Sequence, residues 1–221
     1  MHNPNSKLVR LVDATTEPLA LADAKNFLRV EVTNDDTLIS SLITVARLEC
    51  EAINNRSFIQ TTWQLTLDYF PPYGSQYSSL LPPAIVGPMS GRNYWLNLSD
   101  VAIAFPMPPL IAVTGITYVD PSGTLQTLDP SPSAQNVSIA AGTPGQMTPF
   151  FGKIFPITRP ILSAVNITYT AGFGPDATTV PQNVVQAIRV LTAHYYEHRT
   201  EDTEVPAVVR RLLDPTCWGY Y

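Results

Sequence analysis

Charged residues are scarce in this chain of 221 residues, at 14% of the sequence, where soluble domains have roughly 25%. The 13 Lys and Arg residues are scattered among 18 Asp and Glu residues, and the net charge is -5. Binding to nucleic acid needs clustered basic side chains, so this composition argues against a protein that grips DNA or RNA. The uncharged surface that remains suits extensive contact with other protein chains.

Cysteines and long apolar runs are also few. Cys50 and Cys217 are the two cysteines and lie far apart in the sequence, which favours reduced thiols over a disulfide. The N-terminal stretch lacks the apolar core of a signal peptide, and no run of apolar residues is long enough to span a bilayer. We therefore expect a protein that is made in a cytoplasm and has no membrane partner.

Apolar residues recur at helical spacing near both ends of the chain, which predicts helices within about residues 20–54 and 180–214. Asn54 or Asn55 suits the left-handed conformation that closes a helix. The side chains that this spacing places on the apolar faces are Leu21, Ala24, Phe27, Leu28, Leu38, Ile39, Leu42, Val45, Ala46, Cys50, Ile53, Val184, Ile188, Leu191, Tyr195, Val208, Val209, Leu212 and Leu213.

Between the two helical regions the apolar period changes to two, as in strands with one buried face. The clearest example is "TTWQLTLDYF", whose expected buried side chains are Trp63, Leu65, Leu67 and Tyr69. The turn "DPSG" from Asp120 to Gly123 is placed to close a hairpin. The sequence thus predicts an α+β fold, with a small bundle of N- and C-terminal helices and an antiparallel β unit, about residues 61–172, inserted between the second and third helices.

The predicted β unit is interrupted by a stretch rich in Pro, Gly and Ser, residues 71–95. Its composition predicts a long loop or arm without regular structure. Two interpretations are open, because the segment is either disordered or becomes ordered against a neighbouring subunit. For the second interpretation the candidate interface residues are Tyr73, Tyr77, Leu80 and Leu81.

Five segments of the chain follow one another in a distinctive order: "LALADAKNFLRV", "DDTLISSLITVARLECEAINNRSFIQTTWQLTLDYFP", "PPLIAVTGITYVDPSGTLQTLDP", "VNITYTAGFG" and "VPQNVVQAIRVLTAHYYEHR". Together they resemble the head-tail connector, or adaptor, proteins of tailed bacteriophages and prophages. The resemblance extends from Leu19 to Pro215 and treats residues 1–221 as a single connector domain. One departure is Ala20, where the family usually has a Thr or Ser helix cap, worth about 1 kcal/mol.

The resemblance implies a virion structural protein with no catalytic role and no cofactor. Such proteins form a ring, typically dodecameric, beneath the portal, where they extend the DNA channel. The expected partners are the portal protein, stopper or tail proteins and further copies of the chain, while DNA passes without specific binding. The expected location is the virion neck, between capsid and tail, after synthesis in the cytoplasm of a bacterial host.

The C-terminal tail, residues 215–221, is the second candidate interface. Trp218, Tyr220 and Tyr221 follow the helix end at Asp214, and Trp and Tyr are enriched at the energetic centres of protein interfaces. We expect this tail to dock onto a partner, with the portal favoured. The alternative is that the tail folds back onto the chain's own helices.

An H-x-x-E-H motif at His194, Glu197 and His198 supports a different function, a zinc-dependent hydrolase. Two histidines four residues apart share a helix face, but a catalytic zinc needs a third protein ligand and an open position. Connector proteins commonly have Asn where this chain has His198. We therefore interpret His194 as a packed, hydrogen-bonded side chain, and His194 and His198 remain candidate ligands only under the hydrolase alternative. A third alternative, a β-rich virion adhesion module, predicts a monomer or trimer.

Overall fold

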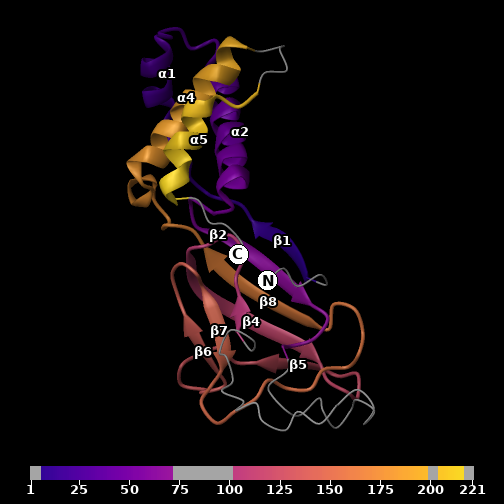
Figure 1. Ribbon diagram of the computed structural model, residues 1–221. Helices are drawn as coiled ribbons and strands as arrows, with labels where there is room; N and C mark the ends of the chain where they lie inside the picture. The colour runs from indigo at the N-terminus through magenta and orange to yellow at the C-terminus, as the bar shows by residue number, and fades with distance from the viewer. Residues whose placement is uncertain (1–5, 72–101, 199–203, 217–221) are drawn as a thin grey trace.

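The computed structural model describes residues 6–71, 102–198 and 204–216. Its helices gather at one end of an elongated molecule and its strands at the other (Figure 1). The helices are α1 (Leu21–Leu28), α2 (Asp36–Asn54), α4 (Gln182–Glu197) and α5 (Ala207–Leu213), with 3-10 turns η2 (Ala177–Thr179) and η3 (Asp214–Thr216). The strands are β1 (Ser6–Val12), β2 (Thr61–Leu67), β3 (Ile103–Ala104), β4 (Leu110–Val119), β5 (Leu125–Leu128), β6 (Val137–Ala140), β7 (Gln146–Pro149) and β8 (Val165–Ala171). The predicted α+β class is confirmed.

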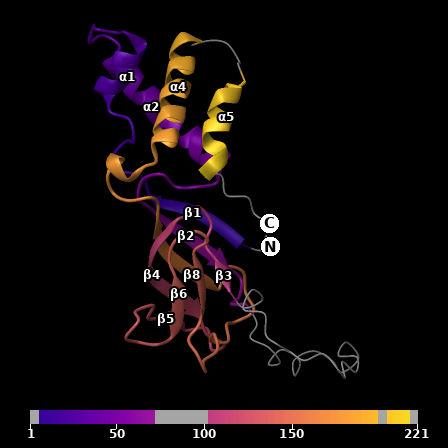
Figure 2. The same cartoon turned by 60° about the vertical axis from the view of Figure 1, so that its left-hand side comes forward.

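The helical region is built from both ends of the chain. Helix α2 packs on α4, α4 packs on α5, and α1 contacts both α2 and α4, an arrangement that two views show (Figures 1 and 2). Asn55 ends α2 in the left-handed conformation, with φ of 52°, as predicted. Ala20 precedes α1 and gives it no side-chain cap. The apolar faces of these helices are thereby buried against one another.

Three side chains expected in the helical core are instead exposed. Phe27 is 47%, Val45 is 49% and Val208 is 46% accessible to solvent. Each belongs to a helix whose apolar face is wider than the part of it that neighbouring helices cover. The apolar pattern predicted the helices correctly, but it overestimated how much of their surface the described part of the chain covers.

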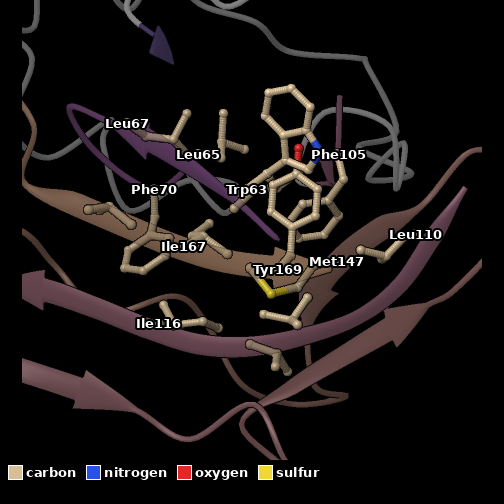
Figure 3. Packing of buried hydrophobic residues seen from close by; sticks show 14 of the residues in the cluster. Trp63, Leu65, Leu67, Phe70, Phe105, Leu110, Ile116, Met147, Ile167 and Tyr169 are labelled. Atoms are coloured by element: carbon tan, nitrogen blue, oxygen red, sulfur yellow. The ribbon is translucent and has the colours of Figure 1, made fainter. Parts of the chain in front are cut away.

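The strands form two antiparallel sheets. The larger has the order β1-β2-β8-β4-β5, and the smaller has the order β3-β7-β6. In the centre of the larger sheet, Trp63 pairs with Tyr169 and Leu65 pairs with Ile167, so their side chains share one face. That face packs with Met147 of the smaller sheet and with Phe105 (Figure 3). The core of the β end therefore lies between the two sheets.

Two predictions in the β unit have different outcomes. The hairpin at Asp120–Gly123 is confirmed, because β4 pairs with β5 directly beyond it and Gly123 takes the positive φ of 94°. The prediction that Tyr69 is buried was wrong. Strand β2 ends at Leu67, Tyr69 is 44% exposed, and Phe70 enters the core in its place, stacked on Phe155 at 4.8 Å between ring centroids.

Candidate interaction surfaces

The two histidines of the H-x-x-E-H motif lie at the C-terminal end of α4, with ring centroids 4.6 Å apart. Nδ1 of His198 is 3.0 Å from the backbone oxygen of His194. Glu197 is exposed. Within residues 6–71, 102–198 and 204–216, no three His, Cys, Asp or Glu side chains are grouped so as to hold a metal ion. The described geometry thus supplies the motif with two histidines and no third ligand for a catalytic zinc.

Of the predicted interface residues, the described part of the chain contains Asp214. It is exposed in η3, directly after the buried Leu213. Asn54 at the end of α2 donates through Nδ2 to Oγ1 of Thr216 at 3.0 Å. The chain therefore leaves α5 where the helical region meets the sheets. The other predicted interface residues lie outside the described residues: Tyr73, Tyr77, Leu80, Leu81, Trp218, Tyr220 and Tyr221.

Many of the exposed large apolar side chains lie in two parts of the described chain. One part is the helical region, with Phe27, Val32, Val45, Leu48 and Val208 at exposed fractions of 38% to 59%. The other lies in residues 151–162, between β7 and β8, and consists of Phe151, Ile154, Ile157, Ile161 and Leu162. Apolar patches of this kind on a protein surface mark places where other molecules bind.

A buried charged cluster holds β1 against α2. Arg47 and Glu51, each 1% exposed, lie one helical turn apart, and Nη1 of Arg47 is 3.3 Å from Oε2 of Glu51. Arg10 of β1 donates to the same oxygen at 2.9 Å, and Arg47 also donates to Glu17 at 2.9 Å. Asp13 completes the cluster, 2.8 Å from Arg10. The cluster thus connects the edge strand of the sheet to the longest helix.

Burial is the largest influence on Glu51 and raises the pKa of its carboxyl group, against the lowering effect of the backbone N–H of Phe58 and of the two arginines. That N–H donates to Oε1 of Glu51 at 3.0 Å. Both oxygens of this buried carboxylate therefore accept hydrogen bonds from within the protein. The sequence contained a signal for this cluster, because Arg47 and Glu51 stand on the same side of α2 as Ile43, Cys50 and Asn54.

Comparison of the sequence with protein-family models and with curated proteins gave no match. Solved structures do match nearly the whole chain. A chain in the neck of an empty gene transfer agent (GTA) particle, computed with C6 symmetry, is 19% identical, with 97% of each chain covered and a TM-score of 0.71. A chain of the native GTA virion is 19% identical, with 97% of this chain and 96% of that chain covered and a TM-score of 0.70.

The chain has the fold of a virion neck protein. A third match, in the neck of the native GTA particle computed with C12 symmetry, is 18% identical and covers 97% of each chain, with a TM-score of 0.66. The likeness to head-tail connector proteins that the sequence motifs suggested is thus confirmed at the level of the fold. In the described segments, no helix combines the length and the apolar character needed to cross a membrane.

Proposed function

We propose that this chain is a head-tail connector subunit of a virion neck, without catalytic activity. Twelve copies form a ring under the portal, extend the DNA channel and offer a platform to stopper or tail proteins. The observation that carries this proposal is the match to neck chains of GTA particles over 97% of both chains, with both core regions included. A match over a single sheet or bundle would support a shared fold and little else.

Charge and surface support the same function. A net charge of -5 suits the wall of a channel through which DNA slides, because a basic wall would hold the phosphates. The exposed apolar groups at both ends of the molecule suit a subunit that has neighbours on several sides. In this proposal the C-terminal tail, which starts beyond η3 at the junction of the two regions, docks onto the portal.

The decisive experiment mixes the protein with its portal and measures the mass of the complex by size-exclusion chromatography with light scattering. We expect the portal to gain twelve copies of the 24.2 kDa chain, including when the free protein is a monomer, since the portal can template the ring. A protein that forms a trimer and ignores the portal would contradict the proposal and favour the adhesion module.

A truncation tests the tail. Removal of residues 217–221, which keeps Thr216 as the acceptor for Asn54, is expected to abolish portal binding and to leave the unfolding temperature of the free protein almost unchanged. The matched control is Leu125→Asp, a change at a 66% exposed side chain of β5, at the edge of the larger sheet opposite β1, which is expected to bind the portal normally. Unchanged portal binding after truncation would remove the tail from the proposal. Zinc bound at one ion per chain and lost in His198→Ala would instead favour the hydrolase.

A further inference from the structure

The outer side of α2 carries no charge over three turns. From Thr37 to Leu48 the one charged residue is Arg47, and its side chain is buried in the ionic cluster. Val45 is 49% and Leu48 is 38% exposed on this side, next to exposed serines. A helix on the surface of a soluble protein normally has charged residues on its solvent face. We call Val45 and Leu48, with the uncharged residues around them, the α2 face.

A second apolar face lies at the end of α1. Phe27 is 47% exposed and Val32, just after the helix, is 59% exposed. We call these two residues the α1 face. Figure 1 shows α1 at the left of the helical region and α2 at its right, and α1 also packs directly against α2. The exposed apolar side chains of the α1 face and the α2 face therefore belong to two neighbouring helices.

The geometry of α2 directs its exposed face away from α1. Leu21 at the start of α1 lines a small pocket together with Ser40 and Ile43 of α2, so α1 lies over that side of α2. At 100° per residue, Val45 is about 200° around the helix axis from Ile43. The α2 face thus points away from α1. Two different apolar faces, one on each helix, are what a head-to-tail ring requires of every copy.

We propose that the α2 face of one copy packs against the α1 face of the next copy, and that this contact closes the ring. The inference rests on the proposed function, because only a closed ring needs both faces in each copy. A second copy fits the α2 face better than a charged partner does, since a charge placed against Val45 and Leu48 would lose water to apolar side chains, and the exposed residues from Thr37 to Val45 carry no charge. Residues 151–162 lie in the β unit, outside the helical region, and have no part in this contact.

Assembly on the portal tests the contact. The variants Val45→Asp with Leu48→Asp, and separately Phe27→Asp, are expected to lower the number of copies retained on the portal by about tenfold or more, as loss of an interface centre does. Their unfolding temperatures should stay close to that of the unchanged protein, because these side chains are already exposed in one copy. Leu125→Asp, with 66% exposure on β5, is the matched control and should assemble fully.

A cross-link tests which faces meet. In a background with Cys217→Ser, the pair Val45→Cys and Phe27→Cys should give, on oxidation of the portal complex, a ladder of covalent multimers that extends beyond the dimer. Each single variant should give no ladder, since one cysteine per copy joins at most two chains. Cys50 is buried and does not compete. Substitution at Val32 in place of Phe27 provides a second position if the geometry of one pair is unsuitable.

The two proposals fail in different ways. If the unchanged protein does not assemble on the portal, the connector function fails. If it assembles, and the Val45→Asp and Leu48→Asp variant assembles equally well, the function stands and the interface is overturned. Loss of assembly in that variant without a ladder from either cysteine pair also overturns the proposed contact, because the α2 face would then meet the portal or another neck protein.

Discussion

The two cores of the molecule have the same number of buried residues but different chemistry. The core between the sheets has five aromatic side chains among its 16 buried residues, and the helical core has one, Phe58, among its 16. Packed sheets lie about 10 Å apart, and large aromatic rings can fill that space. The separation of packed helices is about 8–10 Å and depends on the side chains at the contact, and the helical core here contains small and branched side chains such as Ala46, Ala187 and Val184.

The cores also differ in how their polar groups are satisfied. Between the sheets, the hydroxyl of Tyr169 donates to the backbone oxygen of Pro106 at 2.8 Å, the indole N–H of Trp63 donates to Ser57, and none of the clustered side chains is charged. The helical core instead has the Arg47–Glu51 pair on its longest helix, extended by Arg10 from the sheet. The charged groups are thus located where the two regions meet, and they connect the cores.

The largest effect is expected for Glu51→Ala. This change removes the buried carboxylate that Arg47 and Arg10 share and leaves Arg47 with Glu17 and Asp13 alone. Breaking one side of a buried ion pair costs about 3–5 kcal/mol. The change also removes the acceptor for the backbone N–H of Phe58. We expect the free energy of unfolding, measured in urea, to fall by about 3–5 kcal/mol. Both the helical core and the core between the sheets should be destabilised.

Two controls isolate the buried charge at Glu51. Glu51→Gln keeps an acceptor for Phe58 and most of the shape, so its loss should be smaller, about 1–3 kcal/mol. Glu49→Ala removes a carboxylate two residues away that lies outside the cluster, and should change stability by about 0.5 kcal/mol or less. Equal losses for Glu51→Ala and Glu49→Ala would show that the cluster contributes nothing beyond surface charge.

The next effect compares the cores directly through two isoleucines with no exposed surface, Ile188 on α4 and Ile167 on β8. Each Ile→Ala change should cost about 2–5 kcal/mol, from lost transfer energy and the remaining cavity. If the ionic cluster joins the cores into one cooperative unit, both variants should show a single transition in calorimetry, shifted to lower temperature. Separate transitions, with only one of them shifted by each variant, would mean that the helical and sheet regions unfold independently.

A smaller effect is expected for Ser57→Ala at the junction. The indole N–H of Trp63 donates to Oγ of Ser57 at 2.9 Å, and both side chains are buried. Without that acceptor the N–H is left unpaired, at a cost of about 1–3 kcal/mol. Ser41→Ala, on the exposed side of α2, is the matched control and should leave the urea midpoint unchanged. A midpoint equally unchanged in Ser57→Ala would show that water replaces the lost acceptor.

The sequence predicted the long elements because their periodicity is uninterrupted. Helix α2 and strands β2 and β8 repeat apolar residues often enough to identify both the element and its buried face. Strand β1 was not predicted. It is an edge strand with an irregular burial pattern, and it exists because it pairs with β2, a contact that no local pattern encodes. Strands β6 and β7 have four residues each, too few to establish a period.

The candidate surfaces were harder to predict than the fold. The spacing of α2 places Arg47 and Glu51 on its buried side, but charged residues are mostly exposed, and the partner Arg10 is distant along the chain, so the ionic cluster was not predicted. The sequence predicted Val45 and Phe27 to be core residues, but both are exposed in the structure. Apolar periodicity does not distinguish the core of one chain from a contact between chains. The expected interface residues in 71–95 and 215–221 stay predictions, since Asp214 is the one that the structure describes.

The smallest effect concerns Asp120, in the hairpin turn at the outer edge of the larger sheet. Its carboxylate accepts hydrogen bonds from Oγ of Ser122, Nε2 of Gln126 and the backbone N–H of Thr124. These bonds, that of Ser122 first, lower the pKa of Asp120 from 3.8 to about 2. Because the folded-state pKa lies below the unfolded value, the stability from this group is present above pH 3.8 and is lost as the pH falls toward about 2.

Carboxyl titration by NMR should therefore place the Asp120 midpoint near 2. Asp120→Asn should remove this part of the acid dependence and perturb the amide signals of β4 and β5 alone, with α2 and α4 unchanged. A midpoint at 3.8 would mean that the turn is open in solution. Changes in the amide signals of α2 would mean that the β5 edge of the larger sheet is coupled to the helical core. That coupling would be tighter than the ionic cluster of Arg10, Arg47 and Glu51 predicts.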